Sequence, residues 1–201
     1  MLKLPDSDEP LRIMSVDPGT DTLGVSLLEA DTYENTCVVV NTTTLVGTEL
    51  LKKTDFGKSL LTTHKVKYQR LSALRKQLYI YYRTYHPHVI CCEGNFMGAS
   101  MSSFASLVEA AYMVRNLAFE LDPYAYFTEI SPSEGKASVN LHDKKTKVRD
   151  AIKKELDGNN ALRLSKDVHL DDLDEHGLDS IIIGYAFYKQ LEVRKCESKP
   201  S

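Results

Sequence analysis

The chain has 201 residues, of which 42% are hydrophobic and 26% are charged, a composition typical of one globular domain with its own core and not of a disordered protein. No apolar run approaches the roughly 20 residues that span a bilayer, and the acidic N-terminus does not resemble a signal peptide, so we expect a cytoplasmic protein that does not enter the membrane. The net charge of −3 does not single out a nucleic-acid binder, and the four cysteines lack the spacing of zinc sites or disulfide frameworks.

Three strands open the predicted fold. Residues 11–16 form the first strand, which ends at Asp17 before a Pro-Gly pair that favours a turn. Residues 23–29 and 37–46 are rich in β-branched side chains and predict two more strands. The short connections between the three strands indicate antiparallel pairing.

Helices and strands then alternate along the chain. Residues 58–85 repeat leucine and tyrosine every three or four positions, which predicts a helix that a His-Pro pair ends. A short apolar strand over 88–92 leads to Glu93, and a helix over 102–121 and a strand over 124–130 follow. Strand–helix–strand connections imply that these two strands pair in parallel with the first strand of the chain.

Capping signals mark the helices of the C-terminal third. Ser131, followed by proline and by Glu134, predicts a helix start with a capping box. Asp143 is placed to cap the next helix, which we expect to end at Gly158. A final helix over 175–193 is apolar nearly all round in its middle, which predicts that it is buried.

These elements predict a single α/β domain with a mixed five-stranded sheet flanked by helices. We expect this domain to span residues 11–193. The polar ends, residues 1–10 and 194–201, are predicted to be disordered or frayed.

Two carboxylates stand at the ends of predicted strands. Asp17 ends the first strand and Glu93 ends the strand over 88–92. In an open α/β sheet, functional sites gather at the carboxyl ends of the strands, so neighbouring strands would bring these two side chains together. Taken singly, Asp17 also fits a turn residue before Pro-Gly, and Glu93 fits a solvated strand end.

The start of the last helix carries more acidic residues than helix capping needs. His176 and Asp179 lie three residues apart and share one helix face, and Asp172, Asp174 and Glu175 precede or flank them. The helix dipole explains one or two acids, but so many at the start of a buried helix repel one another unless a cation or water reaches them. For His176 alone, a surface histidine at a helix end is the alternative. Whether Asp174 or Glu175 joins the site stays open.

Carboxylate and imidazole ligands at one sheet edge indicate a divalent metal site. Together Asp17, Glu93, His176 and Asp179 offer the ligands that suit Mg²⁺ or Mn²⁺. Paired ions about 4 Å apart activate a water and stabilise the leaving oxygen in phosphodiester cleavage. In such a site, His176 would act as a neutral ligand or as an acid–base group.

Charge is distributed unevenly over the second half of the chain. Between Lys136 and Lys154 there are seven Lys or Arg residues and two acids, whereas between Asp167 and Asp179 there are six acids and no Lys or Arg. A basic segment beside an acidic cluster suits a protein that binds phosphates and a divalent metal. Two solvated faces are the alternative that charge alone leaves open.

Four short motifs follow one another in the chain: Asp17-Pro18-Gly19-Thr20, Cys92-Glu93-Gly94-Asn95-Phe96-Met97, Lys144-Lys145-Thr146-Lys147-Val148 and His176-Gly177-Leu178-Asp179-Ser180. Together, over about residues 11–190, they resemble the motifs of the RuvC-like Holliday junction resolvases, a group with the RNase H-like fold. Some members of that group carry Asp where His176 stands. The segment over 47–66 is longer than the resemblance leads us to expect, and the divergence favours a phage or viral source.

The resemblance implies a structure-specific DNA endonuclease that resolves four-way junctions by paired, metal-dependent nicks. It implies two Mg²⁺ ions per site, with Mn²⁺ as a substitute, held by catalytic residues Asp17, Glu93, His176 and Asp179. It also implies a homodimer that sets two active sites on opposing strands, in the host cytoplasm if the source is a phage. The helix over 102–121 is the candidate dimer surface, unless both of its faces serve the domain core.

The resemblance also implies which side chains contact DNA. The candidate phosphate contacts are Lys136, Lys144, Lys145, Lys147 and Arg149, which would hold DNA in register without reading bases. Phe96 lies in a loop just after Glu93 and would wedge or stack on a base near the crossover. Ordinary packing against the following helix is the alternative for Phe96.

Three other functions compete with a strict junction resolvase. A broader nuclease for flaps and branched DNA would use the same scaffold. A non-catalytic RNase H-like nucleic-acid-binding protein would not need all four candidate ligands. The Asp-Pro-Gly-Thr motif also occurs in phosphate-binding ATPases, but these need a second lobe for which 201 residues leave no room.

Overall fold

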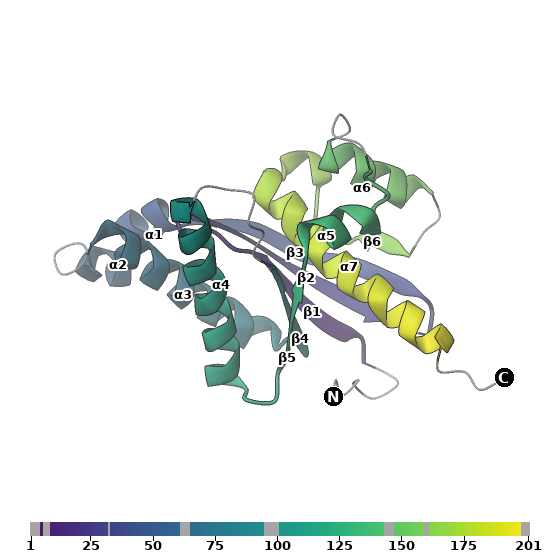
Figure 1. Ribbon diagram of the computed structural model, residues 1–201, viewed down its shortest axis with the longest axis horizontal. Helices are drawn as coiled ribbons and strands as arrows, with labels where there is room; N and C mark the ends of the chain where they lie inside the picture. Colours follow the sequence, from purple (N-terminus) through teal and green to yellow (C-terminus); the bar gives the residue numbers. More distant parts are fainter. Residues whose placement is uncertain are drawn as a thin grey trace.

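A six-stranded mixed sheet forms the centre of the protein, with strand order β5-β4-β1-β2-β3-β6 (Figure 1). The computed structural model describes residues 5, 9–31, 33–60, 65–94, 101–142, 147–158 and 161–197. The strands are β1 (Leu11–Asp17), β2 (Thr22–Asp31), β3 (Thr36–Val46), β4 (Val89–Glu93), β5 (Tyr126–Ile130) and β6 (Leu162–Leu164). The first three pair in antiparallel fashion, and β4, β5 and β6 join in parallel, as predicted for all but β6.

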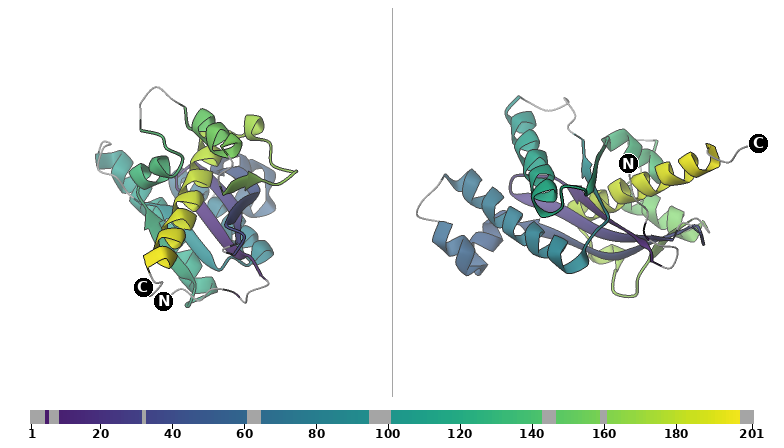
Figure 2. Two further views of the ribbon diagram at one scale, coloured as in Figure 1. Left: turned by 90° about the vertical axis from the view of Figure 1, so that its right-hand side faces the viewer. Right: turned by 90° about the horizontal axis from the view of Figure 1, so that it is seen from below.

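Helices cover both faces of the sheet. They are α1 (Gly47–Lys53), α2 (Asp55–Leu60), α3 (Val66–Tyr85), α4 (Met101–Leu121), α5 (Pro132–Ser138), α6 (Val148–Asp157), the short 3-10 helix η1 (Leu170–Asp172) and α7 (Glu175–Glu197). Helix α7 covers one face of the sheet, and α3 and α4 cover the other (Figure 2). Side chains alternate along β1, so Ile13 belongs to the core cluster under α7, whereas Met14 belongs to the cluster under α3 and α4. None of the helices in the described ranges is both long and apolar enough to cross a bilayer.

The predicted helix over 58–85 proves to be two helices. The residues of α2 end at Leu60, and α3 begins at Val66 after an extended Lys65 with φ of −61° and ψ of 142°. The predicted end of this helix is confirmed. His86 adopts a left-handed conformation with φ of 45°, a geometry that commonly ends a helix.

The capping box at the start of α5 is confirmed. The Ser131 hydroxyl accepts from the backbone N–H of Glu134 at 3.2 Å, and the Glu134 carboxylate accepts from the backbone N–H of Ser131 at 2.8 Å. The cap predicted for α6 is wrong, because α6 begins at Val148 with Lys147 at the N-cap, and Asp143 lies outside the described residues. The end of α6 at Gly158 is confirmed.

The last helix, α7, lies very close to the sheet. Residues 180–188 are buried on every side, as their composition predicts. A Cβ atom at Gly184 would lie 2.5 Å from Leu28 Cδ1 and 2.7 Å from Ser15 Oγ, so only glycine fits there. Ser15 also donates a hydrogen bond of 2.6 Å to the carbonyl of Ser180, whose hydroxyl lies 2.6 Å from Ser26 Oγ. Buried hydroxyls therefore fix the position of α7 along the strands.

We expect Gly184→Ala to destabilise the protein by about 1–3 kcal/mol, the usual cost of an added methyl in a closely packed core. The free energy of unfolding in urea measures this change. Gly135→Ala in α5 is the matched control, because its Cβ would lie 3.6 Å from the nearest atoms, an ordinary contact, and alanine favours helix. Equal stability of the two variants would contradict the close packing of α7.

Candidate active site

The carboxyl ends of β1 and β4 bring Asp17 and Glu93 to one edge of the sheet. The two strands are parallel neighbours, and Val16 pairs with Cys92. Asp17 and Glu93, the next residues along the chain, are therefore side by side at the ends of their strands. Asp17 is buried and Glu93 is half-buried. The expectation that these strands are neighbours is therefore met, and neither carboxylate is a freely solvated strand end.

The first turn of α7 adds His176 and Asp179 to this edge. His176 Nδ1 lies 2.7 Å from Asp17 Oδ2. This approach depends on Gly24, the cross-strand partner of Asp17, because a Cβ there would lie 2.1 Å from the carbonyl oxygen of His176. A glycine on β2 thus lets the start of α7 rest on the sheet beside Asp17.

Electrostatic coupling shows that the carboxylates share one site. Burial, reinforced by the negative charges of Asp17 and Asp179, raises the pKa of Glu93 to about 7. Burial and the charge of Asp17 raise the pKa of Asp179 to about 6. The hydrogen bond to Asp17 raises the pKa of His176 and outweighs the opposing effect of burial. The site therefore holds more negative charge than its protein neighbours neutralise.

Among the described residues, Lys136 is a lysine whose charge acts on two of these carboxylates. It lies on α5, directly after β5, and its charge partly offsets the rise in the pKa of both Glu93 and Asp179. The sequence placed Lys136 among the candidate DNA contacts, and the structure puts this exposed lysine beside the acidic cluster. The positive charge of Lys136 at this position would attract a phosphate group toward the carboxylates.

Asp174 has a structural task at the start of α7. Its Oδ1 atom accepts from the backbone N–H of Gly177 at 2.9 Å, as an N-cap residue does, and from Thr44 Oγ1 on β3 at 2.5 Å. Burial works against its ionisation, but these hydrogen bonds prevail and lower the pKa of Asp174. Asp174 therefore holds α7 against β3, while Glu175 is exposed.

Arg149 holds the segment that leads into α7. Its guanidinium donates to the carbonyl oxygens of Leu170 at 2.9 Å and Leu173 at 2.5 Å, and it lies 3.6 Å from the Asp171 carboxylate. These contacts join the first turn of α6 to η1. Among the other predicted DNA contacts, Lys147 is exposed just before α6, whereas Phe96, Lys144 and Lys145 lie outside the described residues.

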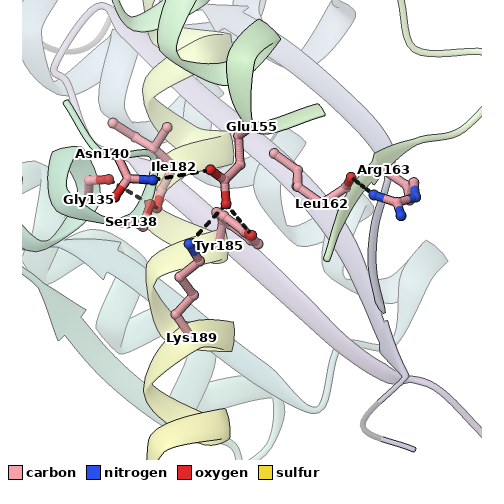
Figure 3. Close-up of polar contacts among 9 residues, drawn as sticks. All are labelled: Gly135, Ser138, Asn140, Glu155, Leu162, Arg163, Ile182, Tyr185 and Lys189. Carbon is pink, nitrogen blue, oxygen red and sulfur yellow. Dashed lines mark hydrogen bonds and ion pairs between the residues drawn. The ribbon is translucent and has the colours of Figure 1, made fainter. Parts of the chain in front are cut away.

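A buried carboxylate holds the other end of α6 to α7 (Figure 3). Glu155, 3% exposed, accepts hydrogen bonds from Tyr185 Oη at 2.7 Å and from Lys189 Nζ at 2.9 Å. Asn140 Nδ2, just after α5, lies 3.4 Å from the second oxygen of Glu155. Helix α6 is thus held to η1 at its start, through Arg149, and to α7 at its end, through Glu155.

The chemistry of the donor set fits a divalent cation. Three carboxylates and one imidazole meet at the edge, and the raised pKa values of Glu93 and Asp179 record charge that a cation would neutralise. As these side chains stand, no group of three or more His, Cys, Asp or Glu residues in the described ranges is arranged to hold a metal, and His176 occupies one oxygen of Asp17.

The sheet order, the flanking helices and carboxylates at the carboxyl ends of adjacent strands define an RNase H-like fold, as the sequence predicts. Sequence comparison found no matching family model and no matching curated protein. Among solved structures, Thermus thermophilus RuvC in complex with a Holliday junction substrate aligns with a TM-score of 0.67 at 15% identity, over 92% of this chain and 96% of that one.

Two further resolvases share this fold. The yeast mitochondrial Holliday junction resolvase Ydc2 aligns with a TM-score of 0.67 at 16% identity, over 93% of this chain and 82% of that one. The fowlpox virus resolvase, in complex with Holliday junction DNA, aligns with a TM-score of 0.54 at 13% identity, over 89% of this chain and 99% of that one. The fold is therefore that of the junction resolvases over nearly the whole chain.

We expect divalent metal to raise the melting temperature more at pH 8 than at pH 5. The pKa values of Glu93 and Asp179 are higher in the folded protein than in the unfolded chain, so the folded state is more stable when these carboxyl groups are protonated. That stability is lost as pH rises through about 6 to 7 and the two groups ionise. A cation competes with those protons and restores the stability at high pH. Scanning calorimetry with Mg²⁺, Mn²⁺ or chelator measures the effect.

Two variants make this thermal test specific. Asp17→Asn should lose most of the metal-dependent shift, because it removes one candidate ligand charge. Asp157→Asn, an exposed aspartate at the end of α6, should keep the shift. A metal effect of the same size at both pH values, or one that survives in Asp17→Asn, would contradict a metal site at this edge.

Proposed function

We propose that the protein is a metal-dependent DNA endonuclease that resolves four-way junctions by paired phosphodiester hydrolysis. The observation that carries the proposal is the meeting of Asp17, Glu93, His176 and Asp179 at the strand ends. The fold supports it, because solved structures that share it are resolvases bound to junction DNA. We also propose that the protein acts in the cytoplasm.

The four residues would hold Mg²⁺, or Mn²⁺ in its place, with two ions per site. When bound, such ions supply an activated water and stabilise the leaving oxygen. The protein contributes a rigid edge on which the ligand atoms are held by the sheet and by α7. Asp17 orients His176 through their hydrogen bond, and Lys136 brings a positive charge to the phosphate beside the carboxylates.

Phosphate contacts would continue from Lys136 along the basic segment to Lys144, Lys145 and Lys147. Arg149 belongs to this set in our sequence-based prediction, and its hydrogen bonds to two carbonyl groups favour a second task, that of holding this segment to the site. Phe96 remains our proposed wedge at the crossover.

One face of α4 supports the proposed homodimer. Four exposed apolar side chains are spaced by seven, four and seven residues, which places them on one helix face: Met101, Val108, Tyr112 and Phe119. The opposite face, with Ala111, Val114 and Ala118, is buried against the sheet. The helix therefore serves the core with one face only, and an exposed apolar stripe of this kind suits contact with a second copy.

Asp17→Asn should abolish cleavage of a labelled four-way junction in Mg²⁺ or Mn²⁺ while leaving junction binding intact. The cleavage rate should fall by more than roughly 100-fold. A loss of up to that size is typical when a residue that only supports a metal ligand is changed. Asp172→Asn is the matched control, since Asp172 is an exposed acid of η1 close to α7 in sequence. Mapping both nicks, with and without chelator, measures the outcome.

Full activity of Asp17→Asn would overturn the proposed chemistry. The same assay on a fork and a flap distinguishes a strict resolvase from a broader branched-DNA nuclease, which would cut all three substrates at similar rates. Tight metal-independent binding without any cleavage by the wild type would instead indicate a non-catalytic nucleic-acid-binding protein.

Val108→Lys combined with Tyr112→Lys should convert the dimer to a monomer, because two buried charges would face one another across a two-fold interface. Light scattering after size exclusion measures the mass. Tyr124→Lys, at a residue that is 93% exposed and lies beyond α4, is the control that should stay dimeric. A wild-type monomer at micromolar concentration would refute the proposed assembly.

A further inference from the structure

A pair of short helices extends beyond the sheet at the end where the carboxylates meet. These helices, α1 and α2, connect β3 to α3, and they project past the strand ends in two views (Figures 1 and 2). Because β3 runs parallel to β1 across the intervening β2, both strands end at the same edge. We name the unit formed by α1, α2 and the first turn of α3, residues 47–60 and 65–68, the lysine-rich arm.

Contacts between α1 and α2 hold the lysine-rich arm together. The Thr54 hydroxyl donates to the carbonyl of Leu50 at 2.7 Å, at the end of α1, and accepts from the N–H of Gly57 at 2.9 Å, at the start of α2. A Cβ at Gly57 would lie 2.5 Å from atoms of Leu50 and Leu51, so the two helices touch backbone to backbone. These contacts therefore fix the backbones of α1 and α2 relative to each other.

Asp21 joins the arm to the active-site edge. This residue follows Asp17 by four positions, in the turn between β1 and β2. Its backbone carbonyl accepts from the N–H of Gly47 at 2.6 Å, and its side chain accepts from the N–H of Thr48 at 3.1 Å. Arg70 of α3 lies 3.4 Å from the same carboxylate. The position of the arm is thereby tied to the strand end that carries Asp17.

The arm is positively charged in an acidic chain. Between Gly47 and Lys67 there are five lysines and two acidic residues, a net charge of +3, whereas the whole chain has a net charge of −3. Both acids form exposed ion pairs within the arm, Glu49 with Lys53 and Asp55 with Lys58. Lys67 pairs with Glu109 of α4. Within the described ranges, Lys52 and Lys65 are exposed and lie in no ion pair, so their charge is available to a ligand.

Exposed aromatic rings lie among these lysines. Phe56 on α2 is 42% exposed and Tyr68 on α3 is 52% exposed. Cationic side chains that attract a phosphate backbone, interleaved with rings that stack on bases or sugars, are typical of nucleic-acid surfaces.

The charge of the site itself explains why DNA would need this arm. Without bound metal, the ionised carboxylates of Asp17, Glu93 and Asp179 repel a phosphate backbone, so attraction has to come from beside them. The basic segment around α5 and α6 packs with α7 on one face of the sheet, and the arm packs with α3 on the other. DNA that crosses the edge would thus meet cations on both sides of the carboxylates.

We infer that the lysine-rich arm of the protein is a second surface for the DNA backbone. It would bind one duplex branch of the junction where that branch leaves the active site. The inference rests on the proposed nuclease function, since it assumes that DNA occupies the edge. It assigns Lys52 and Lys65 to phosphate contacts and Tyr68 to contact with an exposed sugar or base.

The salt dependence of junction binding tests this inference. Affinity is measured between 50 and 200 mM salt, in chelator so that the junction stays uncut, for the full-length wild type and variants. Each phosphate contact contributes about 0.9 to the slope of log affinity against log salt, so Lys52→Ala with Lys65→Ala should lower the slope by roughly 1.8. Tyr68→Ala should weaken binding about five-fold or more with the slope unchanged.

Arg83→Ala is the matched control. Arg83 is an exposed cation in the last turn of the same helix, 18 residues after Lys65 in the chain, so it lies roughly 27 Å further along α3. Its slope should equal that of the wild type. If the Lys52 and Lys65 variant keeps the wild-type slope, or if Arg83→Ala lowers the slope equally, the arm does not bind the backbone.

The outcomes separate the two proposals. A wild type that cleaves the junction while the arm variants keep its salt slope overturns the arm inference alone and leaves the nuclease standing. A wild type that neither binds nor cleaves junction DNA overturns both. A reduced slope in the arm variant, with its circular dichroism spectrum and melting temperature unchanged, supports the arm as a DNA surface.

Discussion

The close approach of α7 to the sheet is the constraint on which the rest of the site depends. Residues 180–188 of this helix are apolar and buried on every side, so removal of this surface from water drives the helix onto the strands. Glycines make the contact possible, because Gly24 leaves room for the backbone of His176, and Gly184 leaves room for the side chains of Leu28 and Ser15. The same packing sets His176 beside Asp17, although neither residue contributes to the apolar core.

This packing places the carboxyl groups of Asp17, Glu93 and Asp179 close enough to repel one another when they are ionised. Burial, together with the charge of Asp17, makes the ionised forms of Glu93 and Asp179 unfavourable and raises their pKa values. Hydrophobic burial along a long helix outweighs local repulsion at one of its ends. The result is an edge whose ionised carboxylates favour nearby positive charge and disfavour negative charge.

Local signals made much of this architecture predictable from the sequence. The strand-ending acids, the capping box at Ser131 and the buried character of α7 all depend on neighbouring residues, and all agree with the structure. Features that depend on distant contacts were not predictable. The three-residue strand β6 has too little pattern, and the pairing of Thr44 with Asp174 joins positions 130 residues apart. Arg149 lies in a basic run, where nothing local separates a phosphate contact from a residue that holds carbonyl groups.

The two cationic regions are attached to the site in the same manner. Arg149 and Glu155 hold the basic segment to η1 and α7, which lead to and carry His176, while Asp21 holds the lysine-rich arm to the turn that follows Asp17. Each region that would bind backbone is therefore fixed to an element that presents a candidate catalytic group. If both regions held the DNA backbone, the protein would determine the distance between the phosphates and the carboxylates, and the flexibility of the DNA would not. For hydrolysis that depends on positioning a phosphate within a fraction of an ångström, such short, rigid attachments matter more than the number of contacts.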